Sequence, residues 1–247
     1  MSKNASKFTV YYVVGQPRSG STFVGDWIAR DRRILNAGEV WQTFRSLGFV
    51  SDVGFEKSGG RWARPEERGR KNAEIRSDSF WSLVISEIDL APYESLIRQA
   101  KIIGNGMVDC SKTDKGIERY LALGCEVVVI HTQRSFSTWA TSMQGYNQRH
   151  QLPYVSRWRL LLAYLRVNLR HRRWTTKLPY FHVKQERLDN LDSDLDLGFA
   201  PRGAEQGYVR AEMFGTPNFT GSFDARRATS KTAPGDRLLY KMTLASS

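Results

Sequence analysis

The chain has 247 residues, a length that suits one domain with a sizeable core. Its apolar content of 40% and aromatic content of 12% exclude a disordered polymer, and only two cysteines exclude a disulfide framework. The formal net charge of +12 predicts an anionic partner, but it does not choose among nucleotide, nucleic acid, acidic lipid and acidic glycan.

The first predicted element is a strand over residues 8–14, where β-branched and aromatic side chains follow one another as in a strand buried on both faces. A turn between Gly15 and Gly20 comes next. A helical pattern then begins, and Ser19 or Ser21 is the expected N-cap. A strand, a glycine-bounded loop and a helix in this order are typical of an anion-binding loop.

The later elements are predicted in the same way, from apolar spacing and turn residues. Residues 50–78 are rich in Gly, Arg, Glu and Ser, which indicates a surface segment, part loop and part helix, that is a candidate for a lid over a site. Beyond about residue 193 the periodicity is weak. The remaining predictions are strands at 34–35, 102–108, 126–131 and 180–183, and helices at 80–88, 93–100, 115–123, 135–143 and 156–173.

Strands that alternate with helices predict a three-layer α/β/α fold with a mainly parallel sheet, like that of P-loop NTPases, and a single domain over residues 1–247. In such sheets ligands bind beyond the carboxyl ends of the strands. Four groups of residues should therefore converge there: the first loop, Gly38 with Glu39, residues 109–112, and Arg134.

The first loop has the outer spacing of a phosphate-binding P-loop, G-x-x-x-x-G, followed by one residue and then a hydroxyl residue. Ser21 stands where the Walker lysine is expected, and the basic side chain comes earlier, at Arg18. Because that lysine reaches the β- and γ-phosphates of a nucleoside triphosphate, we expect this loop to hold an anion without splitting ATP.

A second group of polar residues follows the strand at 126–131. Arg134 comes directly after it, and Ser142 lies about two helical turns further on. We expect Arg134 and Ser142 to hold one phosphate that the first loop does not reach, the arginine by charge and the serine by a hydroxyl donor. His131, within or at the end of the strand, is in the wrong place for a general base.

Together these stretches resemble the PAPS-dependent sulfotransferases (PAPS is 3′-phosphoadenosine 5′-phosphosulfate), in their bacterial and carbohydrate-type branch. Pro17-Arg18-Ser19-Gly20-Ser21-Thr22 is similar to the family's 5′-phosphosulfate loop, P-K-S-G-T-T, and residues 129–142 are similar to its 3′-phosphate element. Weaker similarities cover Gly38-Glu39, residues 109–112 and residues 182–188.

The resemblance implies transfer of a sulfuryl group from PAPS to an acceptor hydroxyl or amine, with no metal required. Arg18 and the backbone N–H groups of residues 19–22 would stabilise the leaving phosphate, and Lys112 would add a second cation. Glu39 is the expected general base. The phosphate-binding residues implied are Pro17, Arg18, Ser19, Gly20, Ser21, Thr22, Arg134, Ser142, Arg226 and Arg227, the last two from a basic C-terminal loop.

Two other functions stay open from the residues alone. A P-loop kinase would need a lysine at position 21 and an acidic metal ligand at a strand end, for which Asp109 is the only candidate. A non-catalytic basic module for nucleic acid or acidic lipid would need basic residues interleaved with aromatics.

The acceptor is expected to be a small molecule, a glycan or a lipid, and an anionic one suits the basic surplus. Trp41, Phe44 and Trp62 are candidates for lining its pocket. The basic helix at 156–173 is a candidate for contact with an anionic acceptor or membrane surface. We expect no nucleic-acid partner. The polar N-terminus and the short apolar run after it predict a cytoplasmic protein.

Overall fold

The computed structural model describes residues 7–51, 65–87 and 91–185. In this part of the chain five strands form one parallel sheet in the order β2-β3-β1-β4-β5, which confirms the predicted sheet. The strands are β1 (Thr9–Gly15), β2 (Leu35–Asn36), β3 (Gly106–Lys112), β4 (Glu126–Gln133) and β5 (Tyr180–Lys184).

Strand β1 lies in the middle of the sheet, and both of its faces are buried. Val13 packs with Val108 and Val128 on one face, whereas Tyr12 packs into a larger apolar cluster on the other. A strand covered on both faces needs apolar side chains at successive positions, which explains the uninterrupted apolar run of its sequence.

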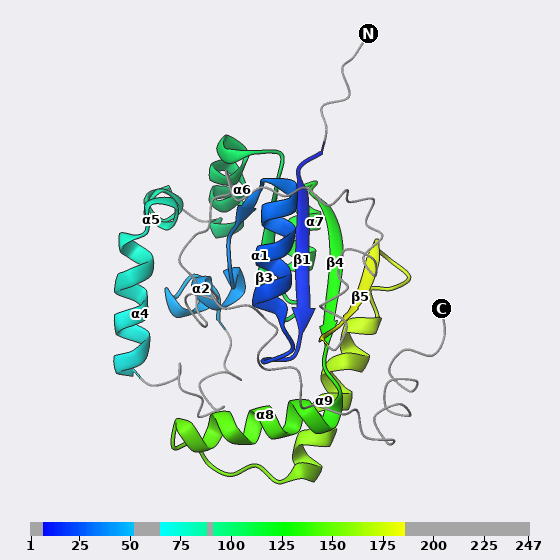
Figure 1. Cartoon of the computed structure of the whole chain (residues 1–247). Helices are drawn as coiled ribbons and strands as arrows, with labels where there is room; N and C mark the ends of the chain where they lie inside the picture. The colour runs from blue at the N-terminus through cyan, green and yellow to red at the C-terminus, as the bar shows by residue number, and fades with distance from the viewer. Residues whose placement is uncertain (1–6, 52–64, 88–90, 186–247) are drawn as a thin grey trace.

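Helices cover both faces of the sheet, as predicted for a three-layer α/β/α fold (Figure 1). Helix α1 packs against β1 and β3 on one face, and α6 and α7 contact β3 and β4 on the other. Helices α8 and α9 lie beyond the carboxyl ends of the central strands (Figure 1). The helices are α1 (Ser21–Arg32), α2 (Val40–Ser46), α4 (Pro65–Ser77), α5 (Ser79–Ser86), α6 (Pro92–Ile103), α7 (Ile117–Ala122), α8 (Phe136–Arg149) and α9 (Arg157–Arg172).

The strand predicted at 102–108 is wrong in its position. Ile102 and Ile103 form the end of α6, and Ile102 is 76% exposed, so its β-branched side chain misled the prediction. The helix ends at Gly104, and β3 begins only at Gly106. Residues 109–112 therefore belong to the strand itself, where their side chains alternate between the two faces of the sheet.

One further difference concerns the segment after β2. Helix α2, which the sequence analysis did not predict, starts directly after Glu39. The segment 50–78 was predicted to be part loop and part helix, and helix α4 agrees with this, while residues 52–64 lie outside the described residues. None of the described helices is long and apolar enough to cross a membrane.

The contact of α1 with the sheet depends on a residue without a side chain. A Cβ atom at Gly25 would overlap Sγ of Cys110 on β3, so the helix backbone lies directly on the strand. This close approach brings the start of α1 against the sheet, and with it the loop that precedes the helix.

We expect Gly25→Ala to destabilise the protein by about 1–3 kcal/mol, because the added methyl group must displace a fully buried sulfur atom. The double variant with Cys110→Ala removes that sulfur, and it should recover most of the loss. Urea denaturation of the four proteins in this cycle measures the effect. Additive losses in the double variant would contradict the contact as the cause.

Candidate anion-binding site

The connections of the sheet change direction at the carboxyl ends of β1 and β4, and we call this switch point the crevice. The connection that leaves β1 runs toward β2, whereas the connection that leaves β4 runs toward β5 on the opposite side. Ligands of open parallel sheets bind where the connections that follow two neighbouring strands run in opposite directions. The loop after Gly15 and the residue after β4, Arg134, both lie at this point.

Hydrogen bonds hold the first loop between β4 and α8. The Ser19 hydroxyl donates to the Gln16 carbonyl at 2.7 Å and lies 2.8 Å from Oγ1 of Thr132 on β4. The indole N–H of Trp139 on α8 donates to the Pro17 carbonyl at 2.9 Å. These contacts fix the loop backbone in one conformation before any ligand arrives.

The structure corrects the expected roles of Ser19 and Ser21. Gly20 is the N-cap of α1, and no side chain caps the helix. Ser19 is buried, and its N–H donates back to the Gln16 carbonyl within the loop, so neither of its polar groups is available to a ligand. The uncapped first turn of α1, which contains Ser21 and Thr22, instead offers N–H groups that suit an anion.

Arg18 projects from this loop toward α8. Its Nε lies 3.5 Å from Oγ of Ser142, and its guanidinium group lies 5.7 Å from the ring centre of Tyr146. The first loop and the group of Arg134 and Ser142, which were expected at two separate phosphates, are therefore in contact through this side chain. The two motifs that the sequence separates by more than a hundred residues meet at this side chain.

Arg134 lies at the other end of the same row of polar residues on α8. Its Nε donates to Oγ1 of Thr138 at 3.0 Å. Thr138, Ser142 and Tyr146 follow one another at a spacing of four, which places them on one face of the helix. Thr138 and Tyr146 were not predicted as site residues, although this spacing around Ser142 was a usable signal.

Glu39 and Lys112 form an ion pair beside the loop. The Lys112 ammonium group donates to Oε1 of Glu39, which is buried at the start of α2. Burial raises the pKa of Glu39 above its usual value, and the neighbouring Lys112 opposes this shift. Lys112 is paired in register with Val14 of β1, so the ion pair lies next to the point where the loop begins.

Two residues at the carboxyl ends of β1 and β3 have strained backbone conformations. Arg18 and Lys112 have φ values of 70° and 62°, which side-chain-bearing residues rarely adopt. In the described part of the chain two other non-glycine residues have positive φ. Arg33 directly follows the end of a helix and Gln151 lies two residues after one, an ordinary place for this conformation. Strain without such a local explanation is typical of functional positions.

Asp109 lies inside the fold and does not face the crevice. Its carboxylate accepts hydrogen bonds from the backbone and the hydroxyl of Ser111, and from the Tyr120 hydroxyl at 2.8 Å. The Ser111 hydroxyl in turn accepts from the N–H of Trp41 at 2.8 Å. Asp109 thus connects β3 with α2 and α7, and both of its oxygens are occupied there.

Three of the four histidines lie together between β4, β5 and α9: His131 on β4, His182 on β5 and His171 on α9. His131 bonds to the Tyr180 hydroxyl at 2.5 Å and to Asn168 at 2.9 Å, and the rings of His171 and His182 lie 5.4 and 5.3 Å away. Burial lowers the pKa of His131 to about 4. His131 is therefore an internal, neutral residue, which agrees with the expectation that it is not the base.

Other predicted residues do not join the crevice. Phe44 is a core residue that packs on Trp81 and Tyr93, and Arg226, Arg227 and Trp62 lie outside the described residues. Within the described ranges, no group of three or more His, Cys, Asp or Glu side chains is placed to hold a metal ion.

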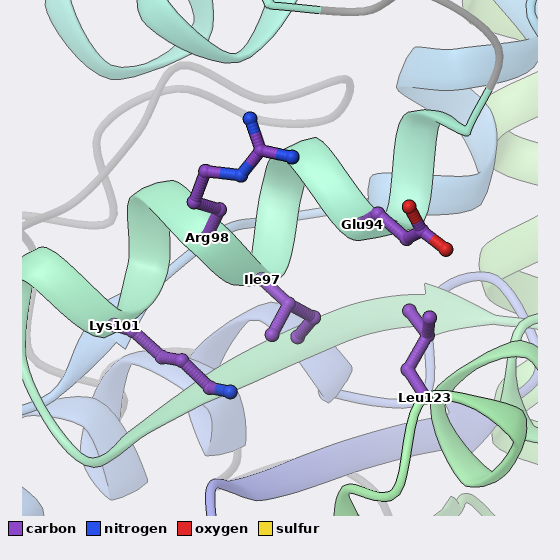
Figure 2. Close-up of a pocket in the computed structure, with 5 residues that line it drawn as sticks. All are labelled: Glu94, Ile97, Arg98, Lys101 and Leu123. Atoms are coloured by element: carbon purple, nitrogen blue, oxygen red, sulfur yellow. The ribbon is translucent and has the colours of Figure 1, made fainter.

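A hollow of about 300 Å³ lies away from this crevice, between α6 and the end of α7. Ile97 and Lys101 of α6 face Leu123 across it, as Figure 2 shows. Helix α6 packs near the opposite end of the sheet from α8 (Figure 1), so the hollow contributes nothing to the predicted site.

No protein-family model and no curated protein matches this sequence.

The pKa of Asp109 provides a test of its buried position. Burial raises this pKa from 3.8 to about 7, so the folded protein binds the proton more tightly than the unfolded chain does. Its contribution to stability is therefore complete below pH 4 and declines as the pH rises through 7. Between pH 5 and pH 8 the wild type should lose about 2–3 kcal/mol relative to Asp109→Asn, measured by denaturant unfolding at both pH values. Parallel pH profiles of the two proteins would contradict this assignment.

Proposed function

We propose that this protein transfers a sulfuryl group from PAPS to a hydroxyl or amine acceptor. The observation that carries the proposal is the meeting of the two phosphate motifs: Arg18 of the first loop reaches Ser142 on α8, and Arg134, just before α8, bonds to Thr138 on the same helix face. Two guanidinium groups and an uncapped helix start then surround one crevice, an arrangement suited to a ligand with two separate anionic groups.

The residues present fit such a donor. The first turn of α1 would hold the 5′-phosphosulfate through its backbone N–H groups, with Arg18 above it. Arg134 and the hydroxyl row of Thr138 and Ser142 would hold the 3′-phosphate. Because hydrogen bonds already fix the loop, these donors need little reorganisation when charge develops on the leaving group.

Glu39 and Lys112 would have different roles in the transfer step: Glu39 would accept the acceptor's proton, and Lys112 would stabilise negative charge. As the acceptor oxygen forms its bond to sulfur, the bond from sulfur to the bridging phosphate oxygen breaks, and the acceptor proton passes to Glu39. Burial raises the pKa of Glu39, which makes it a stronger base than an exposed carboxylate. Lys112 would neutralise negative charge on the sulfonate or on the bridging oxygen.

The kinase alternative has weaker support. Ser21 cannot supply the charge of a Walker lysine, and Asp109, its candidate metal ligand, is fully buried with both oxygens engaged. A purely basic module also explains less, because it gives no role to a buried ion pair between Glu39 and Lys112. The sulfotransferase reaction gives this ion pair a role, and it needs neither a Walker lysine nor a metal ligand at Asp109.

Calorimetry with adenosine 3′,5′-bisphosphate tests the assignment of the two phosphate sites. The wild type should bind it more tightly than adenosine 5′-monophosphate or ATP–Mg²⁺. Arg134→Ala should weaken bisphosphate binding about tenfold to a hundredfold, because a charge-assisted contact to the 3′-phosphate is lost, and it should leave the monophosphate nearly unaffected.

Arg149→Ala is the matched control, since Arg149 lies on the same helix but is exposed and bonds to the Gly145 carbonyl. It should bind like the wild type. A preference for ATP–Mg²⁺, or an equal loss in both variants, would overturn the proposal.

Glu39→Gln tests the base. Release of adenosine 3′,5′-bisphosphate from PAPS in the presence of a panel of hydroxyl acceptors should fall by about 10²–10⁴-fold, whereas bisphosphate affinity should change little. In the wild type the rate should rise with pH through the raised pKa of Glu39, because the carboxylate must be ionised to accept a proton. Full turnover in the variant would remove Glu39 from the mechanism.

A further inference from the structure

Helix α9 carries a second apolar stripe on the side away from the protein. Its inner face buries Leu160, Tyr164 and Asn168. Trp158, Leu162 and Leu169 are 66%, 50% and 50% exposed. At 100° per residue these three side chains lie within about 40° of one another around the helix axis, so they form one outward stripe. Tyr154, 78% exposed, precedes it in the connection from α8.

The charge around this stripe is of one sign. Residues 127–185 contain ten Lys or Arg residues and no Asp or Glu. Arg159 and Arg166 flank the stripe on α9 without an ion-pair partner among the described residues. Arg170 and Arg173 are half-exposed while they contact Asp114 on the inner side.

We infer that the outer face of α9, defined by Tyr154, Trp158, Leu162 and Leu169 with Arg159 and Arg166, docks on an anionic lipid surface. Leucines and a tryptophan bordered by arginines are the composition of a helix that lies in the membrane interface, with apolar side chains below the headgroups and guanidinium groups among them. The inference does not depend on the proposed transferase reaction.

Other occupants fit the stripe less well. A second copy of the chain in a symmetric pair would bring the unpaired arginines of one helix against those of the other, which is unfavourable. Nucleic acid would engage the arginines but would leave Leu162 and Leu169 in water. A lipid surface satisfies both the charge and the apolar side chains.

The test is flotation of the full-length protein with vesicles of phosphatidylcholine alone or of phosphatidylcholine with phosphatidylserine. The wild type should bind only the vesicles with phosphatidylserine. Trp158→Ala with Leu162→Ala should weaken this binding roughly tenfold or more, and Arg159→Gln and Arg166→Gln about fivefold each.

Matched controls come from other faces of the molecule. Ile102→Ala on α6 removes an exposed apolar side chain, and Arg76→Gln with Arg119→Gln removes two exposed charges from α4 and α7. These variants should bind like the wild type, and all variants should keep the thermal stability of the wild type.

Three vesicle results would overturn the inference: no binding, equal binding to neutral vesicles, or equal loss in the control variants. Two other results would point to a different partner and overturn it as well. One is a dimer in solution that Trp158→Ala abolishes, and the other is binding of double-stranded DNA that the arginine changes remove and the apolar changes do not.

Discussion

The candidate site depends on the hydrogen bonds that hold the loop between Gly15 and Gly20. Ser19 and Thr132 join it to β4, and Trp139 joins it to α8. A Cβ atom at Gly15 would overlap the Thr132 carbonyl, so the loop and β4 are in direct contact. If these contacts were absent, Arg18 would have no fixed relation to Ser142, and the two motifs would remain independent surface features.

The same contacts explain why strain is tolerated at Arg18. A non-glycine residue at positive φ costs about 1–3 kcal/mol and persists only where its surroundings determine the conformation. Here the neighbouring Pro17 carbonyl and Ser19 side chain are both held from outside the loop. The strained backbone in turn directs the guanidinium group toward α8. Lys112 is placed similarly, since β3 holds it in register with β1 while Glu39 fixes its ammonium group.

Much of the fold was predictable because its strongest signals are local. The uninterrupted apolar runs of β1 and β4 and the glycine-bounded turn between β1 and α1 led to the parallel sheet and to its functional edge. The errors have physical causes. Ile102 and Ile103 have high β-propensity but continue a helix whose inner face is already set by Leu96 and Ala100. Helix α2 is short, and its buried side chains follow a polar turn without a capping side chain, so no local signal marks its start.

The site was predictable as a set of residues but not as a geometry. Sequence reasoning named Arg18, Ser142, Glu39 and Lys112, yet it did not predict that Arg18 lies beside Ser142. Whether a side chain on α8 meets a loop more than a hundred residues earlier depends on where the helix lies beyond the sheet, and local spacing does not contain that information. The same limit applies to Ser19, whose backbone N–H was expected at the ligand and instead donates to the Gln16 carbonyl within the loop.

The pair formed by α8 and α9 gives the molecule two faces with different physical requirements. Inside, Tyr164 of α9 accepts a hydrogen bond from Gln16 at its carbonyl and donates from its hydroxyl to the Arg134 carbonyl, so the helix supports both ends of the crevice. Outside, the same helix presents apolar and basic side chains that add nothing to this support. A helix that only stabilised the site would gain from polar residues on its solvent side. The exposed Trp158 and Leu162 therefore favour a partner of their own. The absence of acidic residues throughout 127–185 makes an anionic surface the partner that both properties favour.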